Sequence, residues 1–169
     1  MTQTSSMQVT DLIRYNHVVR SLYFEAMTKL PWSEVAADKG LSFESIRNVF
    51  LHLTLVEDRW ISYTIPGRFK DWVDPEFTTF VDMDSLKKYM QHVKDNTEAY
   101  LRELSAEKLS QQIVIPWGDK PNTKITIETG LIHMVMEDMI HYGELSAVLW
   151  QMGLEAPYMG FWRYKHQHP

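Results

Sequence analysis

Apolar side chains recur at steps of three and four residues in four long stretches of the chain, the spacing of one face of an α-helix. These stretches cover about residues 10–30, 42–64, 82–104 and 126–152. Residue types that cap helices stand at their starts: Thr10, Ser42, Asp82 or Asp84, and Thr126. Gly153 follows the last stretch, as expected for a residue just beyond a C-cap. The pattern predicts four helices of about 20 residues.

The connecting segments contain the residues that interrupt helices. Residues 65–81 form a long linker with two prolines and several aromatic side chains, which we expect to pack against the helices. In residues 111–124, Ile113 and Ile115 predict a short strand before a turn at Gly118 and Asp119. The predicted fold is all-α: a single domain over residues 1–169, a four-helix bundle with an irregular or strand-like segment before the last helix.

The last helix carries two ionisable residues on its predicted core face. Its stripe follows steps of three and four residues: Met134, Glu137, His141, Leu145, Val148 and Met152. A carboxylate that points into a bundle without a partner costs several kcal/mol. Glu137 should therefore be paired, protonated or bound to a cation.

Two interpretations of this pair are open. In the simpler one, Glu137 and His141 hydrogen-bond to each other, since residues four apart on a helix are neighbours. In the other, both bind a metal ion together with His52, which lies on or beside the core stripe of the second helix. Two histidines and one carboxylate from facing helices make a three-ligand site with open positions.

The amino-acid composition limits the kinds of site that the chain can form. The chain has no cysteine, which excludes disulfides, a thiolate nucleophile of its own and any metal held by cysteine. Nitrogen and oxygen ligands suit zinc, nickel or ferrous iron. A net charge of −5 gives no reason to expect nucleic acid as a partner. No membrane-spanning run and no signal peptide are seen, so we expect a cytoplasmic protein.

The other candidates are weaker. Glu57, five residues after His52, is a candidate for orienting a metal ligand from the second shell, although such a residue is more often solvated. His133, one turn before Glu137, is a second candidate for that role. His17 and His92 are expected at the surface or rim, and the tail histidines His166 and His168 are expected to bind metal adventitiously at most.

Several segments resemble the DinB/YfiT-like superfamily of metal-binding four-helix bundles. SFESIRNVFLHLTLVEDRW resembles its second helix, and HMVMEDMIHYGELSAVLWQMG followed by APYMGFWRY resembles its last helix and tail. RYNHVV in the first helix fits as well. The usual triad of that superfamily is three histidines, matched here by His52, Glu137 and His141, so Glu replaces the middle histidine. The related mycothiol-dependent maleylpyruvate isomerases use a similar His, Glu, His set around zinc.

The resemblance implies a function in low-molecular-weight thiol chemistry. The three residues would hold a divalent metal, zinc before nickel or iron, and the open position would bind a small thiol and lower its pKa for attack on a small-molecule electrophile. Tyr142, Trp60 or Trp162 are candidates for the electrophile pocket. The resemblance also implies a homodimer.

Two other classes of function remain open. The same ligand set serves zinc hydrolases and ferrous oxygenases. A non-catalytic dimeric bundle, with Glu137 and His141 as a buried polar pair, is the third possibility, and six tryptophans and ten methionines supply apolar surface for its interface.

Overall fold

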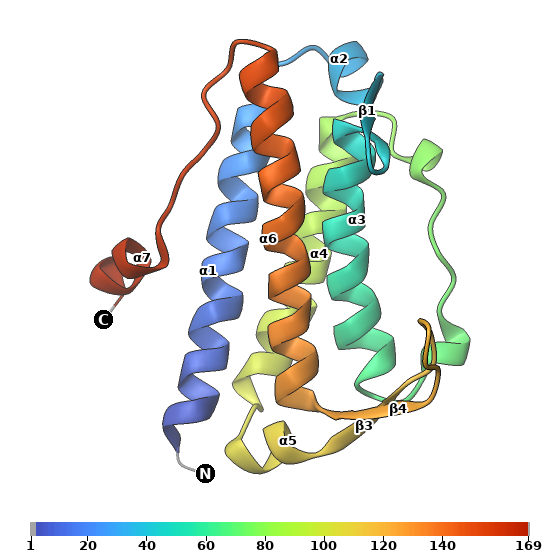
Figure 1. Cartoon of the computed structure of the whole chain (residues 1–169), viewed down its shortest axis with the longest axis vertical. Helices are drawn as coiled ribbons and strands as arrows, with labels where there is room; N and C mark the ends of the chain where they lie inside the picture. The colour runs from blue at the N-terminus through green and yellow to red at the C-terminus, as the bar shows by residue number, and fades with distance from the viewer. Residues whose placement is uncertain (1–2, 169) are drawn as a thin grey trace.

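Four long helices pack into a bundle in the computed structural model, which describes residues 3–168 and the side chains of residues 8–168. These helices are α1 (Gln3–Met27), α3 (Ile46–Asp58), α4 (Met83–Arg102) and α6 (Ile127–Gln151) (Figure 1). A π-helix, η1 (Arg59–Thr64), continues α3. The predicted all-α four-helix bundle is confirmed.

Short elements fill the connections. Three are helices: α2 (Trp32–Ala36), α5 (Ala106–Ser110) and α7 (Phe161–Gln167). Two are 3₁₀ turns in the linker, η2 (Phe69–Asp71) and η3 (Phe77–Thr79). The strands form two antiparallel hairpins, β1 (Asp38–Leu41) with β2 (Glu44–Ser45) and β3 (Gln112–Ile115) with β4 (Thr123–Thr126). The strand predicted at Ile113 and Ile115 is β3, and its partner β4 runs directly into α6.

Two predicted helix starts are wrong. The first helix begins at Gln3 and not at Thr10, because burial of Val9 beside Ile13 in the core stabilises the earlier turns. The second begins at Ile46 and not at Ser42, because residues 38–45 form the β1–β2 hairpin. Ser45 is its N-cap, and the Ser45 hydroxyl accepts a hydrogen bond of 3.1 Å from the backbone N–H of Asn48.

The other caps agree with the sequence. Asp82 caps α4 in a capping box with Ser85, and Thr126 caps α6. Gly153 has a φ of 75°, the left-handed conformation that favours glycine after a helix. Apolar clusters fill the bundle on both sides of its middle, one around Phe50 and Leu53 and the other around Trp60 and Leu131.

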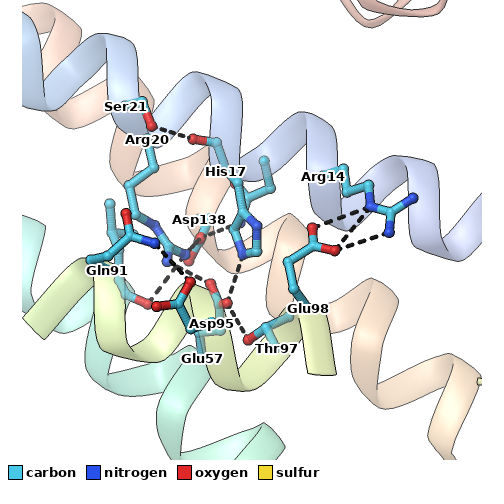
Figure 2. Close-up of polar contacts among 12 residues, drawn as sticks. Arg14, His17, Arg20, Ser21, Glu57, Gln91, Asp95, Thr97, Glu98 and Asp138 are labelled. Carbon is cyan, nitrogen blue, oxygen red and sulfur yellow. Dashed lines mark hydrogen bonds and ion pairs between the residues drawn. The ribbon is translucent and has the colours of Figure 1, made fainter. Parts of the chain in front are cut away.

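An ion network buried between these clusters links all four long helices (Figure 2). Arg20 of α1 donates to Glu57 of α3 and to Asp138 of α6, with 2.5 Å for each nitrogen–oxygen distance. His17 lies 2.7 Å from the second oxygen of Glu57, and the Thr97 hydroxyl of α4 donates to that oxygen. Although burial opposes ionisation, Arg20 and then His17 hold the pKa of Glu57 well below its usual range.

This network corrects two predictions. His17 is not a surface or rim residue, since it is 4% exposed and paired with Glu57. Glu57 is neither solvated nor a support for a metal ligand, because within the described part of the chain its hydrogen bonds go to His17, Arg20 and Thr97. Both errors have one cause, the buried Arg20 one turn after His17. Arg20 belongs to α1 and Glu57 to α3, so the pattern of either helix alone does not show that these residues bury each other's charges.

Replacing Arg20 tests how much the network contributes to stability. Arg20→Met leaves the Glu57 and Asp138 carboxylates buried without their shared cation, so we expect the free energy of unfolding to fall by about 3–5 kcal/mol. The matched control is Arg14→Met, which breaks the more exposed ion pair with Glu98 and should cost at most about 1 kcal/mol. Urea unfolding of the three proteins measures both values, and equal small losses would contradict the prediction.

Candidate metal centre

The structure brings together the three residues singled out in the sequence. His52 lies on α3, and Glu137 and His141 lie one turn apart on α6. One possible ligand atom from each residue lies within 4.8 Å of the other two, and the two imidazole ring centroids are 4.9 Å apart. Ligands held at about 2.1 Å by a tetrahedral ion are about 3.4 Å from each other. Small side-chain rotations would therefore close this group around one ion.

His52 is in the right protonation state to bind a metal. Burial, with smaller contributions from His141 and Arg59, lowers the pKa of His52 to about 4. Its imidazole is therefore neutral at pH 7 and keeps a lone pair for a ligand bond. The chemistry of these three donors thus fits a divalent cation.

A carboxylate orients the second imidazole. The Nδ1 of His141 lies 3.2 Å from Glu144 Oε2, and since a carboxylate only accepts, Nδ1 carries the proton and Nε2 is left free. Glu144 is held in turn by the backbone N–H of Ser42 at 2.5 Å and the Ser42 hydroxyl at 2.7 Å. Burial opposes its ionisation, but these hydrogen bonds lower the pKa of Glu144. Glu144 is not among the site residues predicted from the sequence, although its spacing of three residues from His141 was a usable signal.

His133 and Glu137 form the corresponding pair one turn earlier. Nε2 of His133 is 3.6 Å from Oε1 of Glu137, and both side chains are about half exposed. Glu137 and His141 thus have separate partners on α6, His133 and Glu144, and within the described residues they form no hydrogen bond with each other. This arrangement does not match a buried Glu137–His141 pair.

Glu137 lies on the rim of the core face and not at its centre. Its side chain is 40% exposed and that of His141 is 13% exposed. The fully buried stripe of α6 instead follows Met134, Asp138, Tyr142, Leu145 and Leu149. The buried carboxylate predicted at Glu137 is therefore that of Asp138, one position further on, which pairs with Arg20.

A cavity of about 490 Å³ opens beside His52, a volume within the range of small-molecule sites. Its apolar wall includes Phe43, which stacks on the His52 ring at 4.0 Å and contacts His141 at 5.6 Å between ring centroids. Its polar wall includes Arg59, Asp74 and Glu76. The linker around Pro75, predicted to pack down, supplies one side of this cavity.

The aromatic residues proposed for this pocket lie elsewhere. Tyr142 is buried and stacks on Tyr23, with 4.8 Å between ring centroids. Trp60 is buried against Trp117. Trp162 is exposed on α7. The aromatic side chains at the cavity are Phe43 and Phe77, from the β1–β2 turn and the linker, where helical periodicity gives no guidance.

The remaining histidines are separate from this group. His92 is exposed on α4, as expected, and His166 and His168 are exposed near the C-terminus. Over residues 3–168, His52, Glu137 and His141 are the one group of histidine and acidic side chains close enough to hold an ion.

Comparison with known proteins identifies one family. The sequence profile of the DinB family matches residues 1–168. No curated protein matches the chain. No helix of the described residues is long and apolar enough to cross a bilayer.

Proposed function

The chain belongs to the DinB family, and on this basis we propose that it binds a divalent metal ion through His52, Glu137 and His141 and uses it in small-thiol chemistry. The observation that carries the proposal is the convergence of three ligand atoms from two helices beside an open cavity. Zinc suits two imidazoles and one carboxylate best, with nickel and ferrous iron as the other candidates.

The residues of the proposed site have different roles. His52, Glu137 and His141 would hold the ion, while Glu144 fixes the tautomer of His141 and His133 contacts Glu137. The chemistry that such an ion supplies is to lower the pKa of a thiol, which provides a nucleophile at neutral pH. Because the chain has no cysteine, this thiol must be a separate small molecule. We place the reaction in the cytoplasm, where small thiols stay reduced.

Metal content tests the ligand set. We expect untagged protein to hold about one zinc, nickel or iron per chain by elemental analysis, because three donors meet at one point. Either His52→Ala or Glu137→Ala should reduce this content at least about tenfold. His92→Ala, which removes an exposed histidine from α4, is the matched control and should retain the metal. Metal-free wild-type protein that does not take up zinc would refute the proposal.

Activity assays on the same protein preparation identify the reaction class. Chelator-sensitive transfer of a small thiol to an electrophile such as chlorodinitrobenzene supports the proposal. Ester hydrolysis without thiol would instead identify a zinc hydrolase. Oxygen consumption by the iron form would identify an oxygenase. In each case His52→Ala shows whether the activity belongs to this site.

Glu144 provides a more sensitive test of the geometry. Glu144→Gln keeps the size of the side chain but removes the charge that orients His141, so we expect zinc affinity to fall about 10- to 100-fold. Glu155→Gln, an exposed change beyond the end of α6, should leave the affinity unaltered. Competition with a chromogenic zinc chelator measures both affinities. An unchanged affinity in Glu144→Gln would show that the contact does not support the ligand.

The proposed functional unit is a homodimer, supported by an uncharged stripe along the outer face of α6. The exposed apolar and small residues on this stripe are Ile132, Met136, Ile140, Gly143, Ala147 and Trp150. An apolar row of this length with small residues near its middle suits packing against the same helix of a second copy.

Charge introduced on this stripe should separate the copies. We expect wild-type protein to run as a dimer in size-exclusion chromatography with light scattering, and Met136→Glu with Ile140→Glu to give monomer, because facing copies would bury like charges. Val73→Glu, at an exposed apolar residue in the linker, is the control. A monomeric wild type at micromolar concentration would refute the dimer.

A further inference from the structure

Arg59 lines the cavity, and among the side chains of residues 8–168 its guanidinium group has no hydrogen-bonding partner. Its side chain is partly buried, and its Nε is fully buried with no hydrogen bond. The guanidinium group stacks on Trp117, with its carbon 4.8 Å from the ring centroid. A buried arginine normally forms paired hydrogen bonds with a carboxylate or phosphate. Because Nε is fully buried, a ligand in the cavity would meet the two terminal nitrogens of Arg59, which have no hydrogen-bonding partner within the described residues.

The helix directs Arg59 toward the metal centre. Arg59 follows His52 by seven residues, two helical turns along the same face, and both line the cavity. Arg59 is also close enough for its positive charge to contribute to the lowered pKa of His52. It is also the first residue of the π-helix η1, a distortion that is frequent at functional sites.

Nearby carboxylates do not fully compensate the positive charge of Arg59. Burial outweighs the attraction of Asp74 and Glu137 and lowers the pKa of Arg59. A divalent ion at the centre would cancel the charge of Glu137, and Arg59 would then face a positive centre. An anion between the two would be stabilised from both sides.

We infer that Arg59 binds the carboxylate of the small thiol whose sulfur approaches the metal centre, so that the substrate class is a thiol carrying one carboxylate. This inference rests on the proposed function and adds the identity of its thiol. Asp74 and Glu76 line the same cavity and would repel a second carboxylate. A thiol with several acidic groups is therefore disfavoured.

The experiment compares matched thiols on the cobalt-loaded protein, whose near-ultraviolet charge-transfer absorption reports binding of sulfur to the metal. The probes are 2-mercaptoethanol, 3-mercaptopropionate and mercaptosuccinate. For each variant the measured quantity is the ratio of the dissociation constants of 2-mercaptoethanol and 3-mercaptopropionate. Because the thiols are the same in every variant, differences in their intrinsic pKa cancel between variants.

We expect Arg59→Gln to lower this ratio about 10- to 100-fold, the effect of losing a charge-assisted hydrogen-bonded pair. Arg59→Lys, which keeps the charge but not the planar fork, should lower it less. Arg68→Gln removes a neighbouring arginine that donates to a backbone carbonyl outside this cavity, and should keep the wild-type ratio. Mercaptosuccinate should bind more weakly than 3-mercaptopropionate.

The outcomes separate this inference from the proposed function. If all three thiols bind but the ratio is the same in wild type and Arg59→Gln, the role of Arg59 is refuted while thiol binding stands. Mercaptosuccinate binding at least as tightly as 3-mercaptopropionate would refute the restriction to one carboxylate. If no thiol gives a charge-transfer band with stoichiometric cobalt present, both the proposed function and this inference fail. Cobalt stoichiometry and thermal unfolding of each variant establish that the site is intact.

Discussion

The position of every candidate functional side chain depends on the ion pairs of Arg20. This one residue of α1 joins Glu57 of α3 to Asp138 of α6, and Thr97 adds α4 through Glu57. Glu57 lies five residues after His52, and Asp138 is the residue after Glu137. A slide of α3 against α6 would break both ion pairs, which Figure 2 shows meeting at Arg20. The network therefore fixes the axial register of the two helices that carry His52, Glu137 and His141.

The main effect of such a network is to select one arrangement of the helices. Its net contribution to the free energy of unfolding is small. Taking an arginine and two carboxylates out of water costs several kcal/mol for each ion, and their mutual attraction returns that cost only when the hydrogen bonds are well formed. Apolar packing alone would tolerate many registers, since Leu and Met side chains adapt to small shifts. The buried charges accept few alternatives, because each register other than the observed one leaves an ion unpaired. Burying these charges therefore restricts the helices to one register, which gives the metal centre a defined geometry.

The sequence reveals the helices and the triad through local signals. Caps such as Asp82, Thr126 and Gly153 act over three or four residues, and the spacing of Glu137 and His141 is a property of one helix, so both are visible without tertiary structure. Asp138, Glu57 and His17 are different, because their burial depends on Arg20 of another helix. The helical period also fails to separate Glu137 from Asp138, since a rotation of 100° is within the width of an apolar stripe. The cavity walls Phe43 and Phe77 lie in irregular segments, where no period exists.

The three candidate ligands lie at the rim of the bundle core, and a reactive metal centre needs such a position because a substrate must reach it. A metal group at the middle of the bundle, where Asp138 lies, would be closed by packed side chains and could only be structural. At the rim, the Glu137 side chain is 40% exposed and that of His141 is 13% exposed, and His52, the third member of the group, lines the cavity. Arg59, the first residue of the π-helix, lines this cavity together with His52, Leu55 and Val56 of α3. Two neighbouring positions on α6 therefore have different roles: Asp138 pairs with Arg20 inside the bundle, and Glu137 is partly exposed at its rim.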